Sequence, residues 1–302
     1  MTKDENARRC GLVALIGAPN AGKSTLLNRL LGEPLAIVTP KPQTTRSRLL
    51  GFAILGATQL VLVDTPGIFA PRRRLDRAMV KAAWSGAEDA DLSLLLVDCA
   101  RGIGADVERI LDGLGKRGRK AILALNKIDL VRRDTLLGLA DRLSRKASFE
   151  RVFMISALNG DGVGDLRSYL AENLPEGPWL YPEDQLCDAS ERWVAAEITR
   201  QKVMMQLQDE LPYASTVETE SWEEKKDGSL RIGQIITVER PGQRAIVLGE
   251  GGRRLKAIGV EARREIALRL RRPIHLFLFV KVRAKWSEER ERYRELGLDY
   301  DV

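Results

Sequence analysis

The chain has 302 residues, of which 30% are charged and 44% hydrophobic, and its formal net charge is +7. This length predicts about two domains with ample core, and the absence of any apolar run of about 18 residues argues against a membrane-spanning helix. Three cysteines, Cys10, Cys99 and Cys187, lack metal-ligand or redox spacing, which indicates reduced thiols. Residues 1–9 are polar and lack a signal-peptide core, so we expect a disordered tail and a cytoplasmic protein.

A phosphate-binding loop follows the tail. The apolar residues 12–16 predict a buried strand and residues 25–31 a helix, and residues 17–24 between them fit G-x-x-x-x-G-K-[ST]. Free backbone N–H groups and the helix dipole attract phosphate at such a place. We expect Lys23 to bind the outer phosphates and Ser24 to hold Mg²⁺. The expected phosphate-binding residues are Gly17, Ala18, Pro19, Asn20, Ala21, Gly22, Lys23, Ser24 and Thr25, together with Gly67 from a later loop.

Two segments further on are candidates for sensing the γ-phosphate. Residues 39–46 show no periodicity and predict a loop, in which Thr45, or alternatively Thr44, binds Mg²⁺ only while GTP is bound. The buried strand 60–63 ends in Asp64-Thr65-Pro66-Gly67. We expect Asp64 to hold Mg²⁺ through water and the Gly67 N–H to contact the γ-phosphate, whose loss would release the following loop. The alternative is an ordinary turn with the same residues.

A guanine-binding segment follows two later strands. Asn126-Lys127-Ile128-Asp129 comes after the apolar residues 121–125. The Asp129 carboxylate can accept two hydrogen bonds from guanine, whereas adenine lacks that donor pair, and a site built on such a group rejects the wrong base strongly. After residues 152–155, we expect the Ala157 N–H to meet guanine O6. The expected guanine-binding residues are Asn126, Lys127, Asp129, Ser156, Ala157 and Leu158.

The alternation of strands and helices over residues 10–174 predicts an α/β domain, with a mostly parallel sheet and helices on both faces. Residues 162–173 predict the helix that closes this domain. Residues 175–187 contain three prolines, which favour an extended linker over a helix.

Residues 188–302 predict a second, α+β domain. A helix over residues 190–211 precedes strands over 214–222 and 230–240, which Asp227-Gly228 joins by a turn. A short helix, the segment Gly249-Glu250-Gly251-Gly252, a helix ending near residue 270 and a strand over 274–282 complete it. The lone histidine, His275, lies in that strand and is expected to be a packed or edge residue rather than a catalytic one.

The five nucleotide motifs together resemble the Era-type GTPases, through Pro19-Asn20, residues 43–46 and the D-T-P-G segment. The resemblance implies that Asn20 helps to bind a K⁺ ion in place of an arginine finger; the alternative is a loop-stabilising side chain. Ile68 stands where Ras-like proteins have a water-positioning Gln. The catalytic side chain therefore stays unassigned.

The element order of the second domain resembles a type II KH domain, whose G-x-x-G loop clamps a nucleic-acid backbone. Residues 240–285 contain 13 Lys and Arg against three acids, a charge typical of phosphate binding, although any one of these cations could belong to a solvated helix face. Glu250 and Gly251 stand where the family often has basic residues. The expected RNA-binding residues are Gly249, Glu250, Gly251, Gly252, Arg253, Arg254 and Lys256.

The resemblance implies a GTP-hydrolysing protein that binds the 3′ end of 16S rRNA and acts in assembly of the small (30S) ribosomal subunit. Mg²⁺ and K⁺ are the implied cofactors. Two other classes stay open: a nucleotide-switched RNA-binding module without useful turnover, and a basic protein associated peripherally with the inner face of the cytoplasmic membrane.

Overall fold

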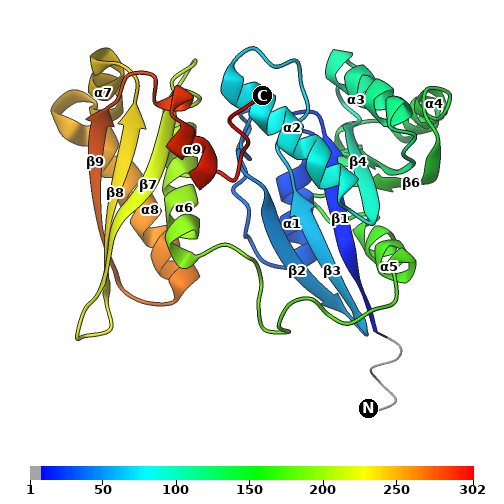
Figure 1. Ribbon diagram of the computed structural model, residues 1–302, viewed down its shortest axis with the longest axis horizontal. Helices are drawn as coiled ribbons and strands as arrows, with labels where there is room; N and C mark the ends of the chain where they lie inside the picture. The colour runs from blue at the N-terminus through cyan, green and yellow to red at the C-terminus, as the bar shows by residue number, and fades with distance from the viewer. Residues whose placement is uncertain (1–7) are drawn as a thin grey trace. The chain divides into compact units, whose positions relative to one another are not determined.

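The computed structural model describes residues 8–302, so nearly all of the expected tail, residues 1–7, lies outside the described part. The chain forms two compact units (Figure 1). The first contains the chain up to Ala36, Thr45–Asp188 and Tyr293–Val302, and the second contains Ile37–Thr44 and Ala189–Arg292. These units differ from the expected domains in two short segments, and the expected linker belongs to the first unit.

The first unit contains a six-stranded sheet in the order β2-β3-β1-β4-β5-β6. All its strands are parallel except β2, which pairs antiparallel with β3. The turn between these two strands is tight, with Gly56 at a φ of +57°, and a short turn joins only antiparallel strands. The strands are β1 (Arg9–Gly17), β2 (Leu49–Leu55), β3 (Thr58–Asp64), β4 (Leu92–Asp98), β5 (Ala121–Asn126) and β6 (Phe149–Ile155).

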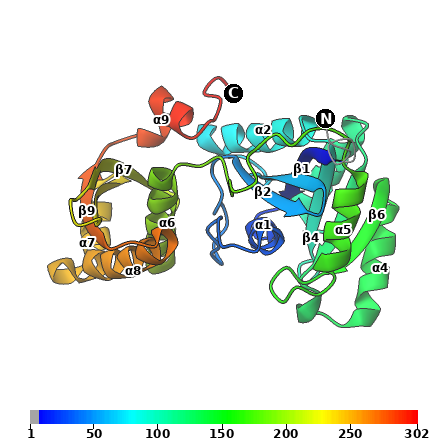
Figure 2. The ribbon, with the colours of Figure 1, turned by 90° about the horizontal axis from the view of Figure 1, so that it is seen from below.

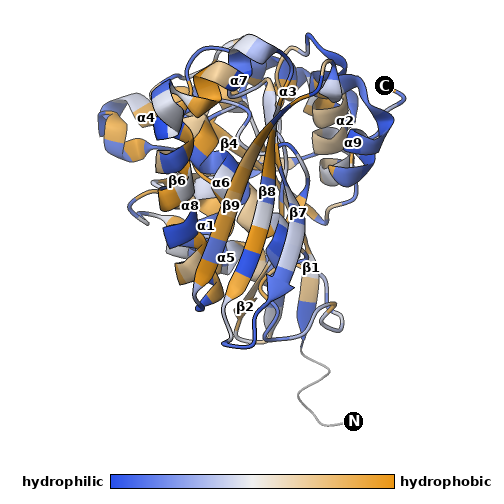
Figure 3. Cartoon of the chain, turned by 90° about the vertical axis from the view of Figure 1, so that its left-hand side faces the viewer, coloured by the Kyte–Doolittle hydropathy of each residue, from blue (hydrophilic) through white to orange (hydrophobic). Residues whose placement is uncertain are grey.

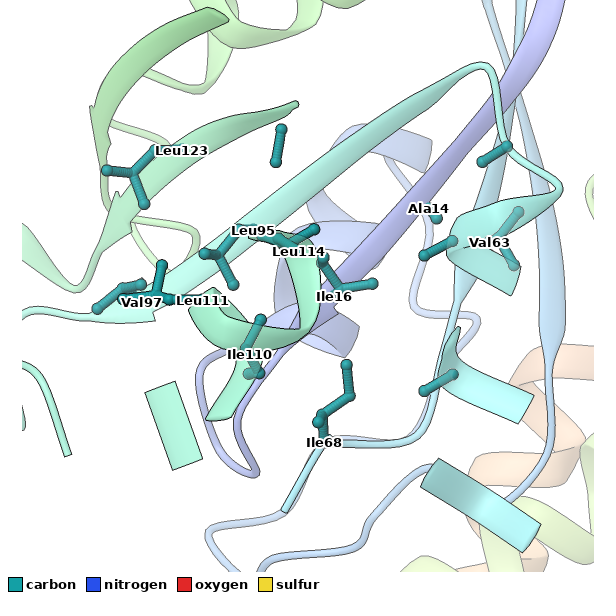
Figure 4. Packing of buried hydrophobic residues seen from close by; sticks show 14 of the residues in the cluster. Ala14, Ile16, Val63, Ile68, Leu95, Val97, Ile110, Leu111, Leu114 and Leu123 are labelled. Atoms are coloured by element: carbon teal, nitrogen blue, oxygen red, sulfur yellow. The ribbon is translucent and has the colours of Figure 1, made fainter. Parts of the chain in front are cut away.

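Helices cover both faces of this sheet. Figure 2 shows α1 and α2 on opposite sides of the strands, and apolar residues of α2, α3 and α4 share one core with the strands they cover. Part of that core is drawn in Figure 4. The helices are α1 (Lys23–Leu31), α2 (Arg74–Glu88), α3 (Ala105–Lys116), α4 (Arg133–Ser144) and α5 (Val163–Asn173).

The proline-rich segment after α5 contains no helix, bends near Tyr181 and packs on the first unit. The Tyr181 ring stacks on Phe52 with centroids 3.8 Å apart. Trp179 Nε1 donates to the Ala57 carbonyl at 3.0 Å, and Gln59 Nε2 donates to the Tyr181 carbonyl at 2.8 Å. These contacts pack residues 175–187 against the sheet of the first unit, so the segment is not a flexible linker.

The second unit contains a three-stranded sheet in the order β7-β8-β9, with β7 antiparallel and β9 parallel to β8. The first helix ends at Gln206, before the expected residue 211, because Leu207 has an extended backbone. His275 is exposed on β9, at the edge of the sheet. The elements are α6 (Glu191–Gln206), β7 (Ser215–Glu224), β8 (Leu230–Val238), α7 (Pro241–Leu248), α8 (Arg253–Leu270) and β9 (Ile274–Val282).

The two faces of this small sheet differ. Val203 of α6 and Ile258 of α8 pack with Ile236 of β8 in the core of the unit. On β9, Phe277 and Phe279 are 44% and 55% exposed. Figure 3 shows that β9, at one edge of the sheet, is largely apolar, whereas β7, at the other edge beyond β8, is more polar.

Two short segments each belong to a unit whose other residues are distant in sequence: residues 37–44 belong to the second unit and residues 293–302 to the first. In the second unit, Gln201 of α6 donates to the Val38 carbonyl at 2.9 Å, and Arg200 donates to the Thr44 carbonyl. In the first unit, the last residues, which follow the short helix α9 (Arg290–Glu295), contact α2, where Arg74 lies 4.5 Å from the Tyr300 ring centroid. Among residues 8–302, no helix is long and apolar enough to cross a membrane.

Candidate nucleotide site and RNA-binding loop

The phosphate-binding loop lies between Gly17, where β1 ends, and Lys23, where α1 begins. In the sheet, β1 separates β3 from β4, so the chain leaves it toward both sides, and ligands bind at such a switch point in open α/β sheets. Gly22 has a φ of +98°, and a Cβ there would lie 2.3 Å from Asn126 Nδ2. Only glycine fits at this position, because the loop backbone comes that close to the guanine segment.

Lys23 is buried and directed at the loop backbone. Its Nζ donates to the carbonyls of Gly17 at 3.1 Å and Ala18 at 3.2 Å, and the residue is only 6% exposed. Burial lowers the pKa of Lys23 to about 8, which the charge of Asp64 partly opposes. A phosphate bound in the loop would supply the negative charge that this buried ammonium lacks.

Three oxygen-bearing side chains converge beside Lys23. Asp64 Oδ2 accepts hydrogen bonds from Ser24 Oγ and from Thr45 Oγ1, both at 2.9 Å, and the two hydroxyls lie 3.0 Å apart. Burial raises the pKa of Asp64, which Lys23 and the two hydroxyls oppose. Asp64 Oδ1 is buried without a hydrogen-bond partner among residues 8–302. Oxygen ligands with one orphaned carboxylate oxygen fit Mg²⁺.

The structure distinguishes the two threonine candidates. Thr44 Oγ1 donates to the Lys41 carbonyl at 3.0 Å and lies 3.1 Å from Thr39 Oγ1. Thr45, by contrast, contacts both Ser24 and Asp64. This geometry favours Thr45 as the residue that could contact a metal.

The D-T-P-G loop approaches the phosphate loop closely. A Cβ on Gly67 would lie 3.0 Å from Pro19, and the Ile68 N–H donates to the Gly17 carbonyl at 3.1 Å. The Ile68 side chain is fully buried, and Figure 4 shows it near Ile16 and Ile110. Ile68 therefore serves the core and has no group with which to orient water.

Asn126 connects the guanine segment to two other loops. Its Nδ2 donates to the Ala21 carbonyl at 2.8 Å, and its Oδ1 accepts from the Ala157 N–H at 2.9 Å. This second bond departs from the expectation that the Ala157 N–H is directed at guanine O6, because a buried amide oxygen needs a donor. The next N–H, of Leu158, has no acceptor among residues 8–302.

The sequence reasoning missed two residues that support the guanine segment, Asp98 and Arg29. Lys127, which has a φ of +66°, donates through Nζ to Asp98 Oδ2 at 2.6 Å. Arg29 of α1 donates to the carbonyl of Ala157 at 3.2 Å and to that of Leu158. Asp98 ends β4 at the edge where the other motifs lie, a position that could have identified it. Asp129 follows, exposed, in a short 3-10 helix (Ile128–Leu130).

The G-x-x-G loop adopts a backbone that favours glycine. Gly249, Gly251 and Gly252 have φ values of +69°, +59° and +77°. A Cβ on Gly249 would lie 2.9 Å from Arg254 Cβ, and α8 begins directly after the loop. Space beside Gly251 and Gly252 is open, so another backbone could approach there.

The basic residues that follow the loop are not equally available. Arg253 pairs with Glu250, and Arg254 Nη1 donates to the Ile246 carbonyl at 2.6 Å. Lys256 is exposed and has no partner among residues 8–302. Lys256 is therefore the cation of this loop that is most available to a phosphate.

The described residues contain no group of three or more His, Cys, Asp or Glu that could hold a metal.

Comparison with known proteins identifies both parts of the chain. A family model described as a 50S ribosome-binding GTPase matches residues 12–127, and one described as a KH domain matches residues 210–287. GTPase Era of Rhizobium meliloti is 59% identical over 292 residues, which cover 97% of this chain and 93% of the relative. GTPase Era of Agrobacterium fabrum is 57% identical over 302 residues, covering 99% and 95%.

Solved structures agree with these relatives. A crystal structure of Era in complex with MgGDPNP and nucleotides 1506–1542 of 16S ribosomal RNA superposes with a TM-score of 0.92 at 37% identity, covering 98% of this chain and all of that one. Era of Aquifex aeolicus, as a variant bound to GDP and AlF₄⁻, gives a TM-score of 0.91 at 37% identity, covering 97% of this chain and all of the other. With its motifs in place on this fold, the chain belongs to the Era family of GTPases and combines a GTP-hydrolysing domain with a KH domain.

Proposed function

We propose that the chain binds GTP with Mg²⁺ at the phosphate-binding loop, and that Ser24, Thr45 and Asp64 hold the metal. The convergence of these three side chains on one point, with Asp64 Oδ1 left orphaned, carries the proposal. When bound, Mg²⁺ neutralises charge on the phosphates. Lys23 binds the outer phosphates from the other side. The solved relative that contains MgGDPNP supports this assignment.

On the base side, Asp129 accepts from the guanine N1–H and exocyclic amine, and the stem of Lys127 lies along the ring. Asn126 fixes the distance between this segment and the phosphate loop through Ala21. Because the Ala157 N–H already donates to Asn126, the Leu158 N–H is the donor we assign to guanine O6.

The ligand of the KH domain is, in this proposal, the 3′ end of 16S rRNA, and the process is assembly of the 30S subunit in the cytoplasm. The 16S rRNA nucleotides bound to the solved relative support this choice of RNA, and the open, positive-φ glycines support backbone binding. RNA crosslinked to the chain in cells should be enriched in that 3′ end. Gly252→Asp, which places a carboxylate where a phosphate approaches, should remove the enrichment; crosslinks spread evenly over cellular RNA would contradict the proposal.

Hydrolysis should be slow without assistance. Ile68 is buried in the core and cannot position water, so we expect turnover on the order of 10⁻⁴ to 10⁻² s⁻¹, as in unassisted GTPases. We assign K⁺ to Asn20, whose φ of +64° places it in the tight phosphate loop. Replacing KCl by NaCl should slow turnover, and Asn20→Ala should abolish that difference. Equal rates of the unmodified chain in both salts would exclude the K⁺ site.

One assay distinguishes a GTPase with useful turnover from an RNA-binding module in which hydrolysis is only a slow timer. If hydrolysis only times release from RNA, saturating 30S subunits should leave the turnover rate unchanged. We expect instead that 30S subunits accelerate it, because a chain that acts in assembly must be reset after each round. The measurement is phosphate release with and without subunits, with Gly252→Asp as the control that should not respond.

A further inference from the structure

A basic surface made of residues outside the nucleotide motifs surrounds α3. Two open hollows of about 430 and 370 Å³ border this helix, and Glu108 lines both. The α3 and α4 helices cover the same face of the sheet, because apolar residues of both belong to one core. We call this region the α3 surface; its cations are Arg109, Lys116, Arg117, Arg142, Arg145 and Lys146.

Half of these cations are paired. Lys146 lies 3.0 Å from Glu108, one of the two acids that line the hollows. Arg117 lies 2.7 Å from Glu88, and Arg145 lies 2.8 Å from Asp141. Exposed pairs of this kind contribute little to stability and are screened by salt.

The other three cations are unpaired. Arg109, Lys116 and Arg142 are exposed, and their side chains have no hydrogen-bond or ion-pair partner in the described chain. Asp112, the second acid that lines the hollows, forms no ion pair among residues 8–302. The surface therefore presents more positive charge than its own carboxylates neutralise.

We propose that the α3 surface binds the phosphate backbone of double-helical RNA, as a second RNA contact on the domain that carries the nucleotide. A polyanion that contacts several unpaired cations releases its condensed counterions, which gives affinity without sequence preference. The choice of RNA as the polyanion rests on the RNA binding proposed above.

The side chains beside the cations favour a duplex over unpaired bases or a bilayer. The large apolar residues that line the hollows, Trp84 and Ile103, are only partly exposed. The Arg117 guanidinium lies 4.2 Å from the Trp84 ring centroid, so the ring is covered and cannot stack on a base. Insertion into a bilayer would also need exposed apolar groups, which the hollows lack. Charge without a stacking ring fits phosphate contacts, which position a partner but do not specify sequence.

The test is the affinity of the full chain for a blunt RNA duplex of about 20 base pairs and arbitrary sequence, over a range of KCl concentrations. The variant carries Arg109→Glu, Lys116→Glu and Arg142→Glu. A control carries Arg77→Glu, Arg151→Glu and Lys226→Glu, which changes the net charge equally at exposed positions outside the surface. GTP affinity and melting temperature report folding, and a second variant with Gln at the three surface positions avoids charge reversal.

We expect the surface variant to lose at least about tenfold in duplex affinity, and its salt slope to fall by about two to three, since each neutralised phosphate contributes about 0.9. The control should change affinity less than about threefold. The loss should persist in a Gly252→Asp background, which removes the KH contact and separates this inference from the proposed KH function. Equal losses in variant and control would overturn the inference. Binding to vesicles that contain half anionic lipid is measured in parallel. If the surface variant loses vesicle binding but not duplex binding, the surface binds a membrane instead.

Discussion

The nucleotide site and the G-x-x-G loop are the two places where we propose phosphate contacts, but the surrounding side chains are placed very differently. At the nucleotide site, Lys23, Asp64 and Asn126 are 6%, 0% and 1% exposed. At the G-x-x-G loop, Gly251 and Lys256 are exposed, and Arg253 is paired with Glu250. Buried groups with fixed partners hold a ligand in one geometry, whereas exposed charge attracts any phosphate chain. Asp129, to which we assign base discrimination, is the exception at the nucleotide site, because its side chain is exposed.

The largest effect should come from Asp129→Asn, which tests discrimination at the nucleotide site. The variant loses both hydrogen bonds to guanine and gains a donor that suits the additional oxygen of xanthine. We expect GTP affinity to fall and xanthosine triphosphate to be preferred, with a change in the affinity ratio of about 10⁴. Competition with a fluorescent nucleotide measures the ratio. A variant that still prefers GTP would contradict the assignment of Asp129.

Lys23→Ala should weaken GTP binding by about 10³-fold, because it removes charge-assisted hydrogen bonds to two phosphates. The melting temperature of the nucleotide-free chain should hardly fall, since burial already lowers the pKa of Lys23 and makes its charge costly. Lys256→Ala is the matched control and should leave GTP affinity unchanged. Unaltered GTP affinity in Lys23→Ala would refute the phosphate-loop assignment.

At the G-x-x-G loop we expect unequal effects from cations only three residues apart. Lys256→Ala should weaken RNA binding by about three- to tenfold and reduce the salt slope by about 0.7 to 0.9. Arg253→Ala should have a smaller effect, because Glu250 already neutralises Arg253. Glu250→Gln should then strengthen RNA binding by freeing Arg253. A larger loss from Arg253→Ala than from Lys256→Ala would show that the ion pair opens when RNA binds.

The smallest expected effect is a change in the protonation of Lys23 when GTP binds. The nucleotide-free pKa of Lys23 is about 8, below the ordinary 10.5, so above pH 8 the folded chain binds fewer protons there than the unfolded chain. Its stability should therefore rise between pH 8 and 10.5. Bound phosphate should restore the proton, so GTP binding at pH 9 should take up a proton in calorimetry with two buffers of different ionisation enthalpy. The same uptake in Lys23→Ala would place the proton elsewhere.

Local features of both sites could be predicted from the sequence, and distant ones could not. The phosphate loop, the D-T-P-G segment and the G-x-x-G loop each lie within a few residues, so spacing defines them. The bond from Arg29 to Ala157 spans 128 residues and leaves no local pattern. The Ala157 N–H was assigned to guanine because its partner, Asn126, is fixed only by the parallel pairing of β5 and β6. The pairing of Arg253 with Glu250, by contrast, is an (i, i+3) contact that spacing could have predicted.

We propose that nucleotide state controls RNA binding. Thr44, whose carbonyl accepts from Arg200 of α6, is adjacent in the chain to Thr45, which contacts Ser24 and Asp64. If Thr45 moves when the γ-phosphate is lost, we expect the adjacent segment that α6 binds to respond. Coupling of this kind typically amounts to about 1–3 kcal/mol.

The most direct test is the affinity of the full chain for nucleotides 1506–1542 of 16S rRNA, the ligand of the solved relative, at fixed salt with GDPNP and with GDP. We predict tighter binding with GDPNP by about 5- to 150-fold, and by reciprocity an equal increase in the preference for GDPNP over GDP when RNA is bound. Gly252→Asp should lose binding in both states. Identical affinities with the two nucleotides would contradict the claim and leave two domains that are merely joined.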